Sequence, residues 1–229
     1  MLELPEAYTV SRQLTDAVRG RTIQSAQANA SPHAFAWFFG DPALYPSLLT
    51  GRTFGDTISA GGQIQSDLQG VLLLLGDGVN IRYHPPGAKL PAKHQLFLGL
   101  DDGSALVCGV QMYGGIWAFM EGANDNFYYK VALEKPSPLT EAFDEAYFEA
   151  LFAGAKPSLS AKAFLATEQR IPGFGNGVLQ DVLFLAGIHP ARPIKTLDDA
   201  DVERLFHTLV KTLRAMAHVK RMRGEAQQK

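Results

Sequence analysis

The chain has 229 residues, which is long enough for one large domain or two small ones, each with a hydrophobic core. Hydrophobic residues make up 46% of it and charged residues 19%, the proportions of a soluble globular protein. The net charge of −2 and the pI near 6.3 argue mildly against nucleic acid as the partner, and the most apolar run, residues 71–75, is far too short to cross a membrane.

The single cysteine, Cys108, excludes an internal disulfide and a cysteine-rich zinc site. No basic segment with a cleavage site opens the chain, so we expect a cytoplasmic protein. The sequence contains no Ser-His-Asp signal, no metal-ligand spacing and no nucleotide-binding glycine loop. We therefore expect no metal and no cofactor.

The first 134 residues read as a helix followed by strands. Pro5 suits a first helical turn, and apolar residues at helical spacing predict a helix to about Arg19, before a strand at 21–27 and an aromatic-rich segment at 31–39. Turns such as 76–78 and 101–103 separate six further predicted strands, which are 51–58, 62–66, 71–75, 79–83, 95–100 and 105–112. Short strands at this spacing indicate a sandwich or a barrel.

The pattern changes at residues 135–138, Lys-Pro-Ser-Pro, which we interpret as a linker. The later segments have helical periodicity, and the predicted helices are 140–152, 160–167, 177–186 and 196–222. Thr196 with Asp199 resembles a capping box at the last of them. We predict an α+β protein, with an N-terminal helix and β-sandwich domain at 1–134 and a helical domain at 135–229.

Residues 168–190 form the most distinctive stretch of the chain. Gly175 permits a positive φ, and Asn176 is a candidate N-cap for the helix that ends near Gly187. A helix start that presents backbone N–H groups is suited to binding phosphate. An ordinary helix–helix turn is the alternative interpretation of Gly-Phe-Gly-Asn.

The other end of the chain favours a specific family. Residues 1–6, Met-Leu-Glu-Leu-Pro-Glu, resemble the Met-Pro-Glu-Leu-Pro-Glu opening of the formamidopyrimidine-DNA glycosylase and endonuclease VIII family. In that family a Gly-x-Gly-Asn segment followed by Ala-Gly-Ile-His-Pro, as at 173–190 here, forms a helix-two-turn-helix DNA-binding element. The resemblance implies a base-excision-repair glycosylase that removes damaged bases from double-stranded DNA, and we expect a monomer.

The resemblance also shows where this chain departs from the family. Leu2 occupies the position of the family's nucleophilic proline, so we expect weak or absent AP-lyase activity. Glu3 matches the family's catalytic acid and Glu6 a second acid of the same opening, although acids in a first helical turn also simply favour the helix dipole. Hydrolytic base removal by a water that Glu3 activates is the chemistry that this pattern permits.

Candidate DNA contacts follow from the same resemblance. Lys162 lies fourteen residues before Asn176, as a family lysine does, and the resemblance implies that Lys162, Gly175 and Asn176 position phosphates. Lys93 with His94 resembles a family Lys-His pair. Met112 or Tyr113, at the family's base-stack wedge, could insert between bases, although such a pair is more often core or hairpin surface. Few residues follow the last predicted helix, so we expect neither the family's C-terminal zinc finger nor its zincless hairpin equivalent.

Charge is unevenly distributed along the chain. Residues 192–229 hold nine Lys or Arg and five acids, and the densest cluster is Lys220, Arg221 and Arg223. A solvated helix end explains this cluster as well as phosphate binding does. Two other functions stay open: a catalytically inactive damaged-DNA-binding module, and an interaction scaffold that no longer binds DNA.

Overall fold

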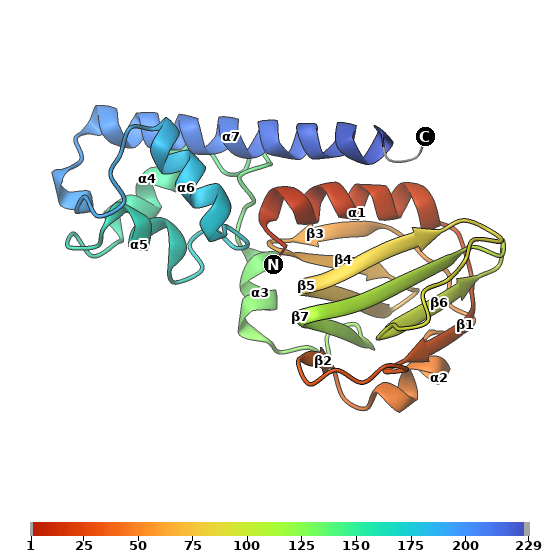
Figure 1. Ribbon diagram of the computed structural model, residues 1–229. Helices are drawn as coiled ribbons and strands as arrows, with labels where there is room; N and C mark the ends of the chain where they lie inside the picture. The colour runs from red at the N-terminus through yellow and green to blue at the C-terminus, as the bar shows by residue number, and fades with distance from the viewer. Residues whose placement is uncertain (1, 227–229) are drawn as a thin grey trace. The chain divides into compact units, whose positions relative to one another are not determined.

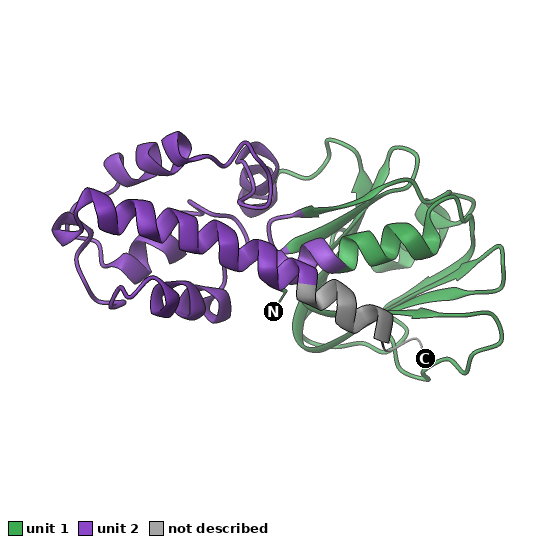
Figure 2. Ribbon diagram, turned by 90° about the horizontal axis from the view of Figure 1, so that it is seen from above, with its two compact units in different colours: residues 1–2, 10–59, 63–125 green, residues 3–9, 60–62, 126–229 purple. Residues whose placement is uncertain are grey.

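The computed structural model describes the backbone of residues 2–226 and the side chains of residues 2–218. The chain splits into two compact units, which Figure 2 shows in green and purple. Unit 1 comprises Met1–Leu2, Val10–Ser59 and Gln63–Asp125, and unit 2 comprises Glu3–Thr9, Ala60–Gly62 and Asn126–Lys229. Two short segments from the first third of the chain, one of which contains Glu3, therefore belong with the helical unit.

Unit 1 is built on a sheet of seven strands, and six of them follow in the order β1-β6-β7-β5-β4-β3 (Figure 1). The short strand β2 pairs with β7 in parallel. The strands are β1 Ile23–Ala28, β2 Ala36–Phe38, β3 Thr57–Ala60, β4 Gln63–Asp67, β5 Val71–His84, β6 Leu96–Leu100 and β7 Ala105–Met120. Together with the helices of unit 2, this sheet confirms the predicted α+β class.

Strands β5 and β7 are longer than the sequence pattern indicated. Residues 76–78, Gly-Asp-Gly, were expected to be a turn between two strands, and this prediction is wrong: β5 runs through them without reversing. Instead the register shifts there, because Asp77 pairs with Gly114 whereas Val79 pairs with Val110. Residues 111–113 of β7 therefore stand opposite Gly78, and the pair of strands carries a bulge at its centre.

The helices of unit 1 cover parts of its sheet. Helix α1, Leu4–Val18, starts in unit 2 and continues into unit 1, where Leu14 and Val18 are buried as its apolar spacing predicts. A 3₁₀ turn, Pro42–Leu44, leads into the short helix α2, Tyr45–Leu49. The buried Tyr45 hydroxyl accepts from the Ala118 N–H at 3.0 Å and so ties α2 to β7.

Unit 2 is helical, and its elements are α3 Phe127–Glu134, α4 Glu145–Ala153, α5 Ala161–Ala166, α6 Asn176–Leu185, η2 Ile194–Thr196 and α7 Asp199–Ala226. The sequence pattern missed α3, which Asn126 caps by accepting the Tyr129 N–H. Phe148 and Phe164 pack edge to face at 5.7 Å in the centre of the core of this unit.

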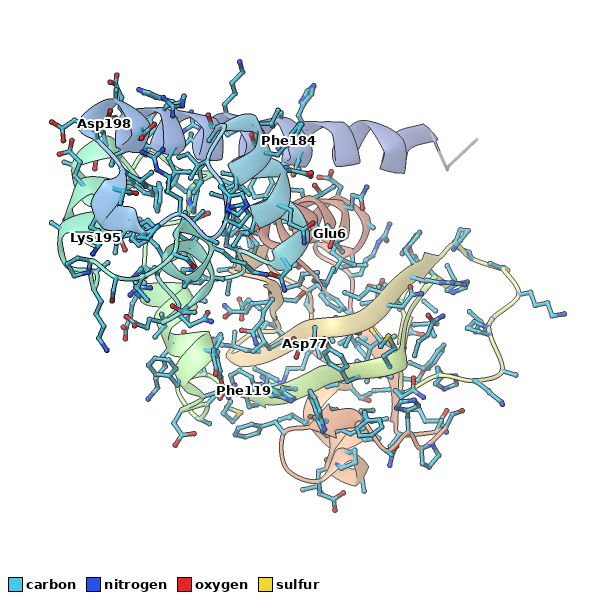
Figure 3. The ribbon with its side chains drawn as sticks, turned by 60° about the vertical axis from the view of Figure 1, so that its left-hand side comes forward. Glu6, Asp77, Phe119, Phe184, Lys195 and Asp198 are labelled. Atoms are coloured by element: carbon cyan, nitrogen blue, oxygen red, sulfur yellow. The ribbon has the colours of Figure 1, made fainter. Side chains whose placement is uncertain are left out.

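The expected capping box at the start of α7 is wrong by two residues. Asp198, labelled in Figure 3, is the residue whose carboxylate accepts the Asp201 N–H at 2.8 Å. Thr196 lies in η2 instead, where its hydroxyl donates to the Pro193 carbonyl at 2.7 Å. A tight 3₁₀ turn therefore ends before α7 begins, and Asp takes the role that Thr was expected to fill.

Candidate nucleic-acid interface

The turn that joins α5 to α6 is held by backbone packing inside unit 2. Gly173 has a φ of +76°, and a Cβ there would lie 2.9 Å from the Gly61 Cα and closer still to the Gly62 nitrogen. Its carbonyl accepts the Leu4 N–H at 2.8 Å. Only glycine fits this position, so the segment 60–62 and the start of α1 are both fixed against the turn.

Arg170 is buried directly before this turn, and sequence reasoning gave it no role. Its guanidinium donates to the Phe164 carbonyl and to the Thr167 hydroxyl, at 3.2 and 3.1 Å, and pairs with the Glu168 carboxylate at 2.5 Å. Glu168 and Gln169 both have positive φ. The buried guanidinium charge of Arg170 is thus satisfied by acceptors of residues 164–168. In turn, these bonds hold the irregular backbone between α5 and α6 in place.

Glu3 makes the central contact of this region. Its two carboxylate oxygens accept the Gly177 N–H at 2.9 Å and the Val178 N–H at 3.0 Å. These N–H groups belong to the first turn of α6 and have no partner within the helix. A carboxylate in this place also interacts favourably with the positive end of the helix dipole. The N-terminal segment of the chain is therefore tied to the helix-two-turn-helix motif by one side chain.

Gly175 leaves the space that Glu3 occupies. A Cβ on Gly175 would lie 2.6 Å from the Glu3 Cδ and 2.7 Å from its Cγ. Its φ of −91° is open to any residue, so the glycine is required by space and not by backbone conformation. The two glycines of the Gly-x-Gly-Asn segment thus have different roles. Gly173 allows the turn to pack against residues 61 and 62, and Gly175 leaves room for the Glu3 side chain.

Two expectations about the start of α6 are corrected by this geometry. Asn176 does not cap the helix, because Gly175 is the N-cap residue and Glu3 supplies the capping oxygens. The Gly177 and Val178 N–H groups are used by Glu3 and are not open to a phosphate. Asn176 itself is exposed, and within residues 2–218 its backbone N–H and its side chain have no protein partner.

The other residues of the N-terminal opening are held by hydrogen bonds. The Glu6 carboxylate accepts the Glu3 N–H at 3.1 Å. This is one of the two hydrogen bonds of a capping box, the bond from the first turn of α1 back to the residue that precedes the helix. Glu6 therefore stabilises the start of α1. The Leu2 N–H donates to the Asp77 carbonyl at 2.7 Å, within unit 1.

The two candidate lysines lie in different units. Lys162 is exposed on the first turn of α5, and its backbone N–H donates to the Pro190 carbonyl at 3.0 Å. This contact joins it to the turn that follows α6, so Lys162 shares the helix-two-turn-helix unit with Asn176. Lys93 is exposed in the loop before β6 in unit 1, where the neighbouring His94 ring contacts Gln27 at 3.3 Å.

Met112 and Tyr113 lie in the bulge of β7. The Met112 side chain is 73% exposed, which is high for a large apolar residue in the middle of a long strand. Tyr113 is half-buried, and its ring lies 5.9 Å from that of Trp37, which is 45% exposed. A bulge re-aims side chains out of the regular alternation, and here it presents an apolar and an aromatic group to solvent.

A thiol, an acidic cluster and a basic cluster could also carry chemistry. Burial raises the pKa of the Cys108 thiol to about 12, so it stays protonated at neutral pH and is no nucleophile. Glu145, Glu203 and His207 place ligand atoms within 4.8 Å of one another, but all three are exposed, which is common for surface acids without an ion. The side chains of the cluster at Lys220, Arg221 and Arg223 lie outside the described residues.

No helix within the described residues is both long and apolar enough to cross a membrane. The fold itself matches solved structures over nearly the whole chain. One is entitled "Structure of MutM in complex with carbocyclic 8-oxo-G containing DNA", with a TM-score of 0.78 and 21% identity over 94% of this chain and 81% of that one. Another is Lactococcus lactis Fpg with DNA that contains an abasic site, with a TM-score of 0.79 and 22% identity over 94% and 78%. The architecture is therefore that of a helix-two-turn-helix protein with an N-terminal helix and a β-sheet unit.

Sequence comparisons make the assignment specific. Residues 135–225 match the family model described as "Formamidopyrimidine-DNA glycosylase H2TH domain". Formamidopyrimidine-DNA glycosylases from Brevibacillus brevis and Cereibacter sphaeroides are each 30% identical to this chain, over 93% and 90% of it and over 76% and 74% of their own length. The relative from Gloeobacter violaceus is 28% identical over 94% of this chain. The chain belongs to the formamidopyrimidine-DNA glycosylase family, as the two distant sequence signatures predicted.

Proposed function

We propose that this protein is a DNA glycosylase of base excision repair, which removes damaged bases from double-stranded DNA by hydrolysis of the N-glycosyl bond. The observation that carries the proposal is the contact between Glu3 and the first turn of α6. It joins the segment that bears the family's catalytic glutamate to the motif that binds DNA in that family.

The chemistry assigned to Glu3 is compatible with its hydrogen bonds. Each carboxylate oxygen offers two lone pairs, and one of each is used by the Gly177 and Val178 N–H groups. The remaining lone pairs are free to exchange a proton with a reacting sugar or a water. The two N–H bonds meanwhile fix the side chain in one position, which is what a general acid or base requires.

Leu2 is the reason to propose hydrolysis without strand cleavage. A β-elimination of the lyase type starts from a Schiff base between an amine and C1′ of the sugar, and the secondary amine of proline is missing at this position. The backbone nitrogen of Leu2 is an amide, and its N–H is used by the Asp77 carbonyl. We therefore propose weak or absent AP-lyase activity.

The DNA contacts that we propose come from both units. Lys162 and Asn176 would contact phosphates, since both are exposed and Asn176 has no protein partner within the described residues. Lys93 would add a further phosphate contact, and Met112 with Tyr113 would fill the gap that a flipped base leaves. We further propose that the protein acts as a monomer in the cytoplasm.

A glycosylase assay on defined duplexes tests the proposal. The panel consists of oligonucleotides that each carry 8-oxoguanine, a formamidopyrimidine, an oxidised pyrimidine or an abasic site. We expect base release by the wild-type protein, its loss in Glu3→Gln, and wild-type rates in the control Glu149→Gln, whose carboxylate is exposed on α4. Borohydride should trap no protein–DNA adduct at the abasic site, and rapid trapping would overturn the proposed absence of lyase activity.

The competing function is that of a damaged-DNA-binding module without catalysis. It is favoured by the same two observations, Leu2 at the nucleophile position and a Glu3 whose oxygens both accept backbone N–H groups. Tight binding to a lesion duplex with no base release from any member of the panel would establish it. Absence of DNA binding altogether would instead favour an interaction scaffold.

A further inference from the structure

The bulge at the centre of β5 holds a carboxyl group for which neither the fold nor the family resemblance provides a role. Asp77 has a φ of +58°, a left-handed conformation that residues with a Cβ adopt rarely. Non-glycine residues in such conformations occur where the surrounding structure imposes them, and they cluster at functional sites. Figure 3 labels Asp77 on this strand.

Glycines surround Asp77 on both strands. Gly76 and Gly78 flank it on β5, and Gly114 and Gly115 of β7 pair with Asp77 and Gly76. Consecutive glycines in the interior of a sheet remove side chains from its surface, and they often mark a place where a ligand approaches the backbone. The residue opposite Asp77 thus has no side chain that could cover the carboxyl group.

The carboxyl group of Asp77 is half-buried, and no group of residues 2–218 forms a hydrogen bond with it. Burial raises the pKa of this carboxyl above its ordinary value, and the positive charge of the chain's N-terminal amine offsets part of that rise. A carboxylate with a raised pKa is a stronger base than an ordinary carboxylate, and this is the property that a general base needs. A buried carboxyl of merely structural use would normally be hydrogen-bonded.

The position of Asp77 links it to the start of the chain. Its carbonyl accepts the Leu2 N–H at 2.7 Å, and both residues belong to unit 1. The residue that stands where the family has its nucleophile is therefore hydrogen-bonded directly to Asp77. Because Leu2 replaces the family's proline, the proposed hydrolysis uses water as the nucleophile, and that water needs a base.

We propose that Asp77 is a catalytic residue, the general base that activates the attacking water, an inference that rests on the proposed glycosylase function. Its carboxylate takes a proton from the water as the water oxygen bonds to C1′. The bond between C1′ and the base nitrogen breaks, its electron pair leaves with the base, and the departing base takes a proton from the general acid, a role that the proposed function leaves to Glu3, which then regains a proton from solvent. Asp77 then releases its proton to solvent, so the reaction consumes one water and yields the free base and an abasic sugar.

Single-turnover base release from the best substrate of the panel tests this role. Asn has nearly the shape of Asp and tolerates positive φ, so Asp77→Asn should fold normally and should lower the rate constant about 100-fold or more. Its Kd for the same duplex should stay within about threefold of wild type, because a general base contributes to the chemical step and not to binding. Asp101→Asn, at an exposed carboxyl of the same unit, should match wild type in both.

Chemical rescue separates catalysis from a structural effect. Glycine adopts the positive φ of this position readily, so Asp77→Gly should keep the backbone conformation. Added formate should restore part of the rate that this variant loses, because it replaces the missing base. Formate should not affect the wild-type rate. Normal base release by Asp77→Asn would overturn the role of Asp77 and leave the proposed function intact. Rapid borohydride trapping of the wild-type protein would identify an amine as the nucleophile. It would overturn the role of Asp77 together with the proposed absence of lyase activity, whereas base release would still support a glycosylase. A wild-type protein that releases no base from the whole panel overturns the proposed function, and the role of Asp77 with it.

Discussion

At the scale of single residues, Glu3 has two structural roles. It is the residue before α1, where its own N–H is bonded by Glu6, and its side chain caps α6. A residue with both roles is expected to tolerate little change, because a substitution removes the acceptors of N–H groups that have no partner within α6. Gly175 belongs to the same arrangement, since its missing Cβ provides the room.

We expect Gly175→Ala to displace the Glu3 side chain and to destabilise the protein by about 1–2 kcal/mol, the usual cost of a lost N-cap. Glu3→Ala should cost a similar amount, and the double variant should cost clearly less than the sum, because both changes remove the same hydrogen bonds. Urea denaturation followed by circular dichroism measures these differences. Gly109→Ala, where the nearest atom to a Cβ is 3.7 Å away, is the control that should leave stability unchanged.

At the scale of elements, the path between α5 and α6 depends on a backbone contact and not on propensity. The turn contains two non-glycine residues with positive φ, Glu168 and Gln169, and the buried Arg170 that holds them. Gly173 then presses against Gly61 and Gly62, which lie more than a hundred residues earlier in the sequence. The bulge between β5 and β7 is a second case, in which the pairing of two long strands decides the conformation of Asp77.

Gly173→Ala and Gly187→Ala form a matched pair that isolates this contact. Both glycines have positive φ, +76° and +65°, but a Cβ on Gly187 would meet no atom within 4 Å. Gly187→Ala should therefore cost only the conformational strain, about 1 kcal/mol, whereas Gly173→Ala should cost about 3 kcal/mol or more, since backbone atoms of Gly61 and Gly62 must move. Equal melting temperatures for the two variants would contradict the close contact.

At the scale of the whole molecule, the net charge of −2 gives no indication of a nucleic-acid partner. Local charge matters more than the total, because the counterions that DNA binding releases depend on the few cations that reach phosphates. The chain spans about three quarters of the length of the curated relatives that it matches, and the match includes both units. The DNA-binding part of the proposal therefore depends on individual exposed residues such as Lys162.

The salt dependence of DNA binding tests this point. We expect the wild-type Kd for a lesion duplex, measured by fluorescence anisotropy between about 50 and 200 mM salt, to rise with a linear log–log slope. Lys162→Ala should reduce that slope by about 1, as the loss of one phosphate contact requires. Lys89→Ala, at an exposed lysine to which we assign no contact, should leave the slope unchanged. A wild-type affinity that does not change with salt would contradict DNA as the partner.

The sequence by itself determined the family, the α+β class and most of the helices. It could do so because turns such as Gly-Phe-Gly-Asn and helices with periodic apolar residues are local structures, and neighbouring residues largely decide local conformation. It also identified Glu3 as important, from its place in a recognised opening. It read Gly-Asp-Gly at 76–78 as a turn, because glycine and aspartate favour turns wherever no partner strand competes.

Only the tertiary structure decided what those residues contact. Glu3, and not Asn176, caps α6, because the cap comes from a segment 174 residues earlier that no local pattern connects to the helix. The Asp77 bulge exists because thirteen residue pairs between β5 and β7 keep both strands extended through a sequence that would otherwise turn. Contacts between distant segments override local preference when the energy of the pairing exceeds the small cost of the unfavourable conformation.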